Sequence, residues 1–291
     1  MTSAREGLRE ISSFLSDCGI DDSEKEAEMI VTHCIGMERV TLYRDNPILS
    51  KQQMADIKSI LDRRRKREPL QYIIGHVDFY GLTIKVGQGV LIPRPETEFM
   101  VDEVIKTVNR KSLGARREEN TSRHVRILDL CTGSGCLALA LAKAFPDAEV
   151  IGTDVSEHAL GFALMNAEIN GIRNVTFLKG NLYEPVKGKT FDIIVSNPPY
   201  IRREEIPLLQ PEVKAWEPLE ALDGGNDGIR FYKQIFSSVS EYLIPGGFLV
   251  MELGQGEAQD VLKISETLGL DAAFLVKDYA GTERIFWLSL E

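Results

Sequence analysis

The sequence lacks the features that mark several protein classes. No apolar run approaches the roughly 18 residues that a membrane-spanning helix needs, and the N-terminal residues carry charge without the apolar core of a signal peptide. The four cysteines include no Cys-x-x-Cys pair, and no Cys or His residues stand at the spacing of a zinc site. We therefore expect a cytoplasmic protein with free thiols, no bound metal and no membrane partner.

Positive charge is also scarce. The 291 residues include 34 Lys and Arg against 44 Asp and Glu, which gives a formal net charge of −10. A non-specific nucleic-acid coat or a binder of anionic membranes needs a basic face, so the composition disfavours both classes. The charge is unevenly spread, because residues 1–90 hold 13 basic and 14 acidic side chains and residues 91–291 carry the remaining −9.

Helical patterning is present in the N-terminal region. Ser3 and Glu6 have the spacing of a capping box, and Ser23 and Glu26 repeat it. Apolar residues follow each pair at steps of three and four, which gives each predicted helix one apolar face. A similar stripe occurs over residues 50–65, so the sequence predicts three helices in this region.

These helices are expected to form a small domain over residues 1–75, followed by a β-hairpin linker over residues 76–95. The first strand of the hairpin is predicted at residues 79–86 and its turn at the Gly-Gln-Gly of residues 87–89. The return strand is predicted at residues 90–92, after which two prolines end the pairing.

Strand and helix patterns alternate in the remaining domain, residues 96–291. Strands are predicted at residues 125–130, 149–153, 175–178, 191–196 and 248–253, and helices at 101–108, 137–144, 158–170 and 229–243. Apolar strands that alternate with helices imply an α/β fold with a parallel sheet covered on both faces. Residues 273–277 and 284–290 form two further strands whose connection is too short for a helical crossover, so the last strand should be antiparallel. The polar run at residues 109–124 is expected to be an exposed loop.

A glycine turn follows the first predicted strand of this domain. The turn consists of Cys131, Thr132, Gly133, Ser134 and Gly135, and a helix follows it. Glycines let a ligand approach the backbone, and the helix start offers free N–H groups with a partial positive charge. This layout is typical of nucleotide-cofactor sites, although a tight strand–helix turn alone would also explain it.

The tips of the next two strands carry further polar groups. Asp154 ends the second strand, where an acid typically holds ribose hydroxyls. The alternative is that Asp154 caps the following helix, a role that Ser156 can share. Asn181 and Leu182 follow the third strand, where a polar side chain can meet an adenine amino group. NAD and S-adenosylmethionine both fit these features, and the antiparallel end of the sheet favours a methyltransferase.

The fourth strand ends in an Asn-Pro-Pro-Tyr turn. Its residues are Asn197, Pro198, Pro199 and Tyr200. The prolines fix φ and remove two backbone donors, so the turn is rigid and presents acceptors. The Asn197 side-chain oxygen and the Pro198 carbonyl suit the two N–H groups of a planar NH₂ nucleophile, and the Tyr200 ring can stack on it. A merely stiff turn is the alternative.

Several segments resemble one known family. Residues 68–75 are Glu-Pro-Leu-Gln-Tyr-Ile-Ile-Gly and residues 91–98 are Leu-Ile-Pro-Arg-Pro-Glu-Thr-Glu. Both look like the linker of the release factor glutamine methyltransferases, the HemK or PrmC family, and residues 217–228 resemble its later motifs. The Asn-Pro-Pro-Tyr turn with its upstream glycine turn resembles the wider group of amino-methyltransferases, which act on adenine, guanine or glutamine. The similarity spans nearly the whole chain.

This resemblance implies a Rossmann-like, S-adenosylmethionine-dependent methyltransferase with a small N-terminal helical domain. Its implied substrate is the side-chain amide of the Gln in the Gly-Gly-Gln motif of class 1 peptide chain release factors. The helical domain would help to dock this protein partner, with no direct need for nucleic acid. By position, residues 131–135, Asp154, Leu182 and Asn197 match cofactor contacts, and residues 197–200 match the glutamine site.

The chain departs from the family pattern at three positions in the expected cofactor site. Cys131 stands where the family commonly has Gly, and Leu182 where an aromatic residue is frequent. Asn181 replaces a common Asp, which removes a charge from the adenine pocket. We expect altered cofactor contacts rather than a different cofactor.

Other hypotheses stay open at this point. An adenine- or guanine-amino nucleic-acid methyltransferase would share the Asn-Pro-Pro-Tyr chemistry, but the acidic charge of residues 91–291 opposes it. A degenerate fold that binds without catalysis is opposed by the intact Asn197 and Tyr200.

Two features have no settled role. The basic run at residues 63–67 is either a solvated helix end, which the helix dipole favours, or a contact for RNA or an acidic partner. Arg94 and Glu96 either hold the glutamine loop or order the domain junction.

Overall fold

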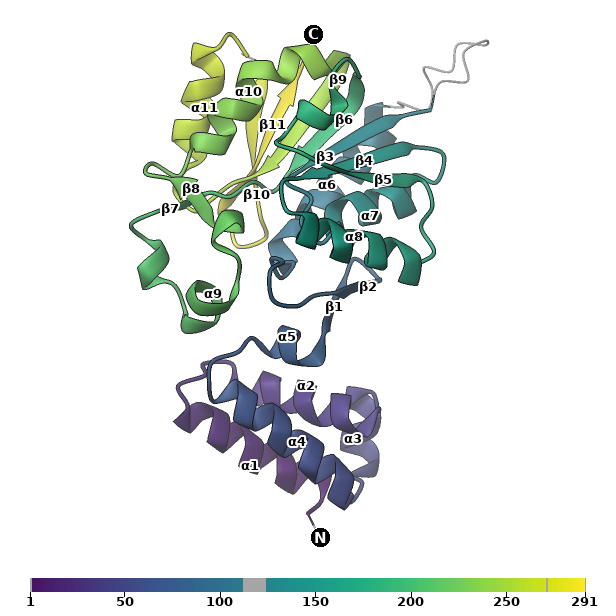
Figure 1. Ribbon diagram of the computed structural model, residues 1–291, viewed down its shortest axis with the longest axis vertical. Coiled ribbons are helices and arrows are strands. Elements are labelled where there is room, and N and C mark those ends of the chain that lie inside the picture. Colours follow the sequence, from purple (N-terminus) through teal and green to yellow (C-terminus); the bar gives the residue numbers. More distant parts are fainter. Residues whose placement is uncertain (1, 112–123, 271, 291) are drawn as a thin grey trace. The chain divides into compact units, whose positions relative to one another are not determined.

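The computed structural model describes residues 2–111, 124–270 and 272–290 (Figure 1). Most of the polar run that we expected to be an exposed loop, residues 112–123, lies outside these ranges. The described chain divides into two compact units. The first contains the chain up to Gly75 together with Pro211–Trp216, and the second contains His76–Gln210 and the chain from Glu217 onward.

The first unit is helical (Figure 1), and its apolar core is formed by residues of the N-terminal helices, between Ala4 and Ile74. Its helices are α1 (Ala4–Asp17), α2 (Ser23–Ile35), α3 (Arg39–Asp45), α4 (Lys51–Arg64), α5 (Leu70–Ile74) and α9 (Pro211–Trp216). The capping box of Ser3 and Glu6 is confirmed at the start of α1. The box expected at Ser23 is wrong, because Ser23 is already the first helical residue and its hydroxyl lies 3.3 Å from that of Ser12.

The basic run at residues 63–67 is partly neutralised inside this unit. Arg64 is buried, and its guanidinium bonds the carboxylate of Glu26 at 2.7 Å and that of Glu212 in α9 at 2.8 Å. Arg67 bonds the same Glu212 carboxylate at 2.8 Å. A solvated helix end does not describe these two arginines, because both bond acids of their own unit.

The second unit begins with the two-stranded hairpin β1 (His76–Phe79) and β2 (Leu82–Lys85). A hairpin was expected in this region, but its predicted return strand is wrong, and its turn lies inside the predicted first strand. The chain does turn at residues 87–89, where the Val90 N–H group donates to the Gly87 carbonyl at 3.3 Å, but this turn does not join the two strands. The turn that joins them is Tyr80 and Gly81, whose φ angles of +49° and +68° suit the two-residue turns that match the twist of paired strands. Residues 90–92 consequently form no strand.

In the described part of the second unit, seven strands form one sheet in the order β10-β11-β9-β6-β3-β4-β5. They are β3 (Arg126–Leu130), β4 (Glu149–Asp154), β5 (Val175–Lys179), β6 (Phe191–Ser196), β9 (Leu243–Glu252), β10 (Ala273–Lys277) and β11 (Glu283–Ser289). β11 is antiparallel to both of its neighbours and the other pairs are parallel. The predicted α/β fold with an antiparallel last strand is therefore confirmed.

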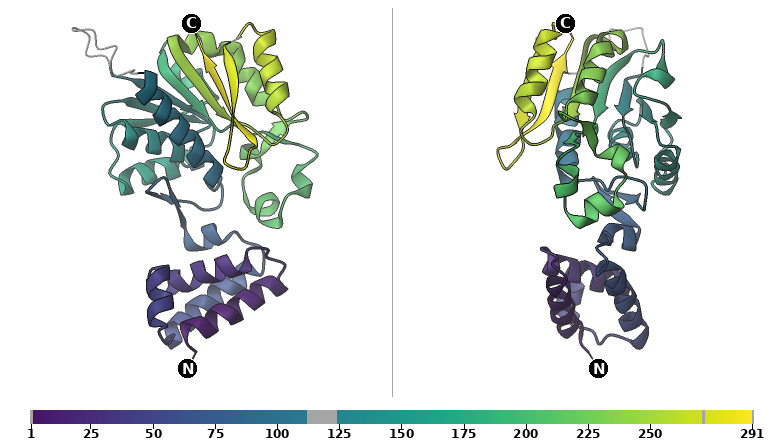
Figure 2. Two further views of the ribbon diagram at one scale, coloured as in Figure 1. Left: turned by 180° about the vertical axis from the view of Figure 1, so that it is seen from behind. Right: turned by 60° about the vertical axis from the view of Figure 1, so that its left-hand side comes forward.

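Helices cover both faces of this sheet (Figure 2). One layer contains α6 (Pro95–Lys111), α7 (Cys136–Ala144) and α8 (Glu157–Ile169), and the other contains α10 (Arg230–Tyr242) and α11 (Ala258–Thr267). The central strands are apolar along their length because neither face meets water. The short parallel pair β7 (Ile201–Arg202) and β8 (Asp223–Gly225) follows the Asn-Pro-Pro-Tyr turn.

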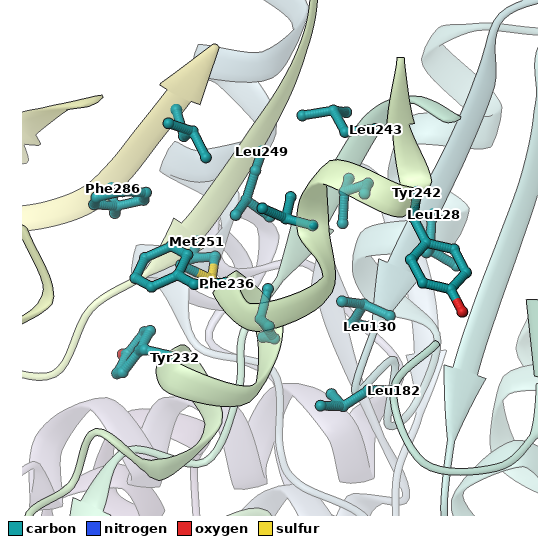
Figure 3. Close-up of a cluster of buried hydrophobic side chains, with 14 of the residues drawn as sticks. Leu128, Leu130, Leu182, Tyr232, Phe236, Tyr242, Leu243, Leu249, Met251 and Phe286 are labelled. Atoms are coloured by element: carbon teal, nitrogen blue, oxygen red, sulfur yellow. The ribbon is translucent and has the colours of Figure 1, made fainter. Parts of the chain in front are cut away.

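A cluster of buried side chains fixes the α10 layer to the sheet (Figure 3). Tyr232 and Phe236 of α10 lie against Met251 of β9 and Phe286 of β11, and all four are at most 3% exposed. Large apolar side chains of this kind stabilise a core by about 1.5–3 kcal/mol each when fully buried. This packing holds the ends of the central strands in place for the site described next.

Candidate active site

A cavity of about 440 Å³ lies at the carboxyl ends of the parallel strands of the second unit. Ligands of open α/β sheets bind at this edge, and the volume is that of a small-molecule site. Nine of the predicted site residues line the cavity. They are Cys131, Thr132, Gly133, Ser134, Asp154, Asn181, Leu182, Asn197 and Pro199. The other three, Gly135, Pro198 and Tyr200, lie in the same two turns but do not line it.

The glycine turn after β3 winds through the left-handed region of backbone space. Cys131, Gly133 and Gly135 have φ angles of +59°, +55° and +79°. A Cβ atom added to Gly133 would meet nothing within 4 Å, whereas one added to Gly135 would lie 3.0 Å from Ala163 and from Phe177. Gly133 thus keeps the cavity open to a close ligand, and Gly135 allows tight packing of α7.

Asp129, which the sequence analysis did not assign to the site, braces this turn from below. Its Oδ2 atom accepts the Thr132 hydroxyl at 2.6 Å and the Ala138 N–H group at 3.1 Å. The carboxyl is fully buried, and its Oδ1 atom has no hydrogen-bond partner within the described chain. Burial raises the pKa of Asp129 to about 7.

Asp154 connects the tip of β4 to the glycine turn. Its Oδ2 atom accepts the Gly133 N–H group at 2.8 Å, and its Oδ1 atom accepts the Ser156 N–H group at 2.9 Å. Burial raises the pKa of Asp154, and these N–H groups oppose the shift by stabilising the ionised form. The alternative helix-cap role is wrong, because Ser156 is the N-cap of α8 and accepts from Ala159.

The wall beyond β5 is apolar. Leu182 is 8% exposed and has a φ of +47°, held in part by a 2.9 Å hydrogen bond from the Thr153 hydroxyl to its carbonyl. Asn181 is exposed, and its backbone N–H group donates to Glu184 at 3.1 Å. This wall offers van der Waals contact with a flat ring and one polar side chain at its edge.

Asn197 is held by residues that sequence analysis missed. Its Nδ2 atom donates to Thr97 Oγ1 at 3.1 Å, and the Thr97 hydroxyl donates to Glu252 Oε2 at 2.6 Å. The Tyr200 hydroxyl lies 3.4 Å from the other oxygen of Glu252. The two polar ends of the Asn-Pro-Pro-Tyr turn are therefore tied to one buried carboxylate at the end of β9.

Arg94, whose role the sequence left open, pairs with Glu217 inside the second unit. The Glu217 carboxylate is 1% exposed and also accepts the Ile92 N–H group at 3.2 Å. Arg94 and the neighbour of Glu217, Pro218, both line the cavity. This pair fastens together two of the loops that form the cavity wall.

Within the described ranges, no group of three or more His, Cys, Asp or Glu side chains has a geometry that can hold a metal ion. No described helix is both long enough and apolar enough to cross a membrane.

The sheet order, its antiparallel β11 and the cavity at the strand tips define a Rossmann-like methyltransferase fold. Solved structures share this fold. A methyltransferase from Pyrococcus furiosus is 23% identical, with a TM-score of 0.51 over 72% of this chain and 88% of that one. The catalytic domain of human Mettl16 is 15% identical, with a TM-score of 0.55 over 73% of this chain and 77% of that one.

Sequence relatives identify the family more closely. Residues 6–75 match the PrmC N-terminal domain, and residues 116–209 match the methyltransferase small domain. A release factor glutamine methyltransferase from Thermodesulfovibrio yellowstonii is 45% identical over 91% of each chain. One from Geobacter sulfurreducens is 42% identical over 94% of this chain and 91% of its own. The chain belongs to the release factor glutamine methyltransferase family.

Proposed function

We propose that the protein transfers a methyl group from S-adenosylmethionine to the side-chain amide nitrogen of the Gln in the Gly-Gly-Gln motif of class 1 peptide chain release factors. The observation that carries this proposal is the Asn-Pro-Pro-Tyr turn, of which Asn197 and Pro199 line the cavity, with Asn197 oriented by Thr97. The names of relatives that match more than nine-tenths of the chain support the choice of substrate.

The cavity fits the cofactor through complementary groups on three strand tips. Gly133 leaves room for close approach and the start of α7 offers backbone N–H groups. Asp154 has lone pairs left over from its two N–H bonds, which suit ribose hydroxyls. The apolar side chain of Leu182 and the polar Asn181 suit an adenine ring and its amino group. S-adenosylmethionine would supply an electrophilic methyl group beside Asn197.

The residues of the turn would orient a weak nucleophile. An amide nitrogen delocalises its lone pair, so it needs accurate alignment with the methyl carbon. The Asn197 Oδ1 atom and the Pro198 carbonyl would accept its two N–H groups and stabilise positive charge as the new bond forms. Tyr200 would pack against the planar amide. No base is needed before transfer, because the surplus proton leaves the nitrogen afterwards.

We further propose that three parts of the chain have different roles. Residues 1–75 would act as the helical substrate-docking domain, residues 76–95 as the linker, and residues 96–291 as the methyltransferase domain. The acidic residues 91–291 suit a protein partner better than a nucleic acid, because a phosphate backbone requires basic contacts.

Transfer of labelled methyl groups tests the proposal. The protein is incubated with labelled S-adenosylmethionine and, separately, a class 1 release factor, its Gln→Ala variant in the Gly-Gly-Gln motif, DNA, and ribosomal RNA. Label is expected only in the unaltered release factor. Label in a nucleic acid but not in the release factor would overturn the proposal in favour of a nucleic-acid methyltransferase. Cofactor binding without transfer to any of these acceptors would favour the non-catalytic alternative.

A further inference from the structure

The hydrogen bonds behind Asn197 have a defined direction. Asn197 Nδ2 donates to Thr97 Oγ1, and Thr97 Oγ1 donates to Glu252 Oε2. Thr97 and Glu252 are each 1% exposed, so water does not compete for these bonds. The three residues come from the end of β6, the first turn of α6 and the end of β9.

The carboxylate at the far end determines this direction. An ionised carboxylate can only accept hydrogen bonds, so it takes the single hydroxyl proton of Thr97. Thr97 then has only lone pairs to offer Asn197, which must turn its NH₂ group away from the cavity. The Asn197 amide oxygen is the atom that remains for a ligand.

The surroundings of Glu252 bear on its charge. Burial is the largest influence and, with the nearby Glu96, raises the pKa of Glu252 above its usual value, whereas the hydroxyls of Thr97 and Tyr200 and the guanidinium of Arg284 favour the carboxylate. The short 2.6 Å bond from Thr97 is of the length that charge-assisted hydrogen bonds adopt.

We propose that Thr97 and Glu252 are positioning residues that fix the polarity of the Asn197 amide, so that the site accepts a neutral NH₂ group and rejects a carboxylate. A carboxylate of the same shape would face the Asn197 oxygen. To donate to that carboxylate, Asn197 would have to rotate and leave the Thr97 lone pairs unmatched in a buried place. The inference rests on the proposed glutamine methylation and adds the origin of its selectivity for Gln over Glu.

Two variants disturb the direction by different routes. Thr97→Val removes the hydroxyl at nearly constant shape and frees the Asn197 amide to rotate. Glu252→Gln introduces a donor, which lets Thr97 donate to Asn197 instead. For both, kcat for release factor methylation is expected to fall about 100-fold, as for a misaligned nucleophile. Thr97→Ser keeps the hydroxyl and is expected to recover most of the loss.

The preference for Gln over Glu shows whether a variant has lost the positioning of Asn197 or has lost activity through general damage to the fold. A release factor with Glu in place of the target Gln serves as a competitor. It should not inhibit the wild-type or Thr97→Ser protein through the active site, but it should inhibit Thr97→Val and Glu252→Gln measurably. If both variants keep the wild-type kcat and the wild-type preference for Gln over Glu, the proposal is overturned.

A substrate-free measurement keeps this test independent of the proposed function. In protein with ¹⁵N-labelled Asn, the side-chain NH₂ signal of Asn197 is assigned by its loss in Asn197→Asp. Its hydrogen exchange should be slow in the wild type and in Thr97→Ser, and about tenfold or more faster in Thr97→Val, as for a lost buried hydrogen bond. Equal exchange rates in the wild type and in Thr97→Val would show that the Thr97 hydroxyl does not hold the Asn197 amide, and would overturn the proposal. A wild type that exchanges slowly but methylates no release factor would instead contradict only the proposed substrate.

Discussion

At the scale of single residues, two side chains in the cavity wall occupy backbone conformations that favour glycine. Cys131 and Leu182 have φ angles of +59° and +47°. A residue with a Cβ atom loses roughly 1–2 kcal/mol in the left-handed region. Both residues line the cavity, so this strain lies at the site itself. Of the two departures from the family pattern, only Cys131 in place of Gly adds strain, because an aromatic residue at position 182 would have the same Cβ atom as Leu.

Replacement of Cys131 measures this strain. Cys131→Gly is expected to be more stable than Cys131→Ala by about 1 kcal/mol, because only glycine adopts this φ without a steric cost. Both variants remove the thiol, so each is the control for the other. Urea unfolding at equilibrium gives the difference, and an equal or greater stability of Cys131→Ala would rule out the strain.

A second residue, Glu257, is expected to make the free energy of unfolding depend on pH. Glu257 is 4% exposed, its Oε2 atom has no hydrogen-bond partner within the described ranges, and Gly228 and Gly254 pack closely around its carboxyl. Burial raises its pKa from 4.5 to about 7. The folded protein therefore binds the Glu257 proton more tightly than the unfolded chain does. The stabilisation by the protonated carboxyl is lost as the pH rises from 4.5 to about 7.

Glu257→Gln is expected to reduce the fall in stability between pH 5 and pH 7 by up to about 3 kcal/mol, since the neutral amide does not titrate. Unfolding free energies at several pH values give the slope. Glu204→Gln, at an exposed position, serves as the control and should keep the wild-type slope. The same slope in both variants would show that the Glu257 carboxyl does not carry this coupling.

At the scale of elements, the turn between β3 and α7 contains two glycines with different roles, one in ligand binding and one in packing. Gly133 faces open space, whereas a Cβ atom at Gly135 meets Ala163 and Phe177 at 3.0 Å. Both glycines have positive φ, so alanine strains the backbone at either position. The two positions differ in what the added methyl group meets.

The alanine variants of these glycines should therefore differ. Gly133→Ala is expected to lower the affinity for S-adenosylmethionine at least about tenfold, with a stability loss near the 1–2 kcal/mol of backbone strain. Gly135→Ala should lose more stability, because overpacking adds about 1–3 kcal/mol. Calorimetric titration and thermal unfolding give the two quantities. The reverse ranking for stability would contradict the assigned roles.

Sequence patterns predicted the long elements well and the short ones poorly. The apolar runs of the central strands and the stripe of α1 span enough residues to show their period. The seven-residue α3 and the five-residue α5 contain too few turns for such a stripe, and both were missed. The hairpin was misplaced because Tyr80, an unusual residue at positive φ, begins its turn.

Site residues were likewise predicted only where a local sequence pattern marks them. The strand-tip residues 131–135, Asp154 and Asn197 were predicted because each directly follows an apolar strand, although their roles toward ligands remain proposals. Thr97 and Glu252 are 155 positions apart, and Ile92 and Glu217 are 125 apart. Pairing over such distances depends on the packed fold, and a single sequence contains no signal for it.

At the scale of the whole molecule, the chain returns to its first unit after leaving it. Pro211–Trp216 belongs with the N-terminal helices, and its Glu212 bonds both Arg64 and Arg67. Removal of one partner from a buried ion pair leaves an uncompensated charge, which costs more than the pair itself gains. A fragment that ends at residue 75 would lack this carboxylate.

Glu212→Ala is expected to destabilise the full-length protein by about 1–3 kcal/mol, a reduced figure because Glu26 still bonds Arg64. Glu38→Ala, at an exposed residue of the same unit whose side chain makes no capping bond, is the control. Denaturant unfolding followed by circular dichroism reports both. Equal stabilities would show that Glu212 does not contribute to the first unit.

The central claim is that the Asn197–Tyr200 turn presents a glutamine amide for methylation. Mass spectrometry of the release factor peptide that contains Gly-Gly-Gln tests it most directly, after reaction with the wild type or with Asn197→Ala. The account predicts one added methyl group on the Gln side chain with the wild type, and none with Asn197→Ala, which should still fold and bind S-adenosylmethionine. A methyl group on another residue, or full methylation by Asn197→Ala, would contradict it.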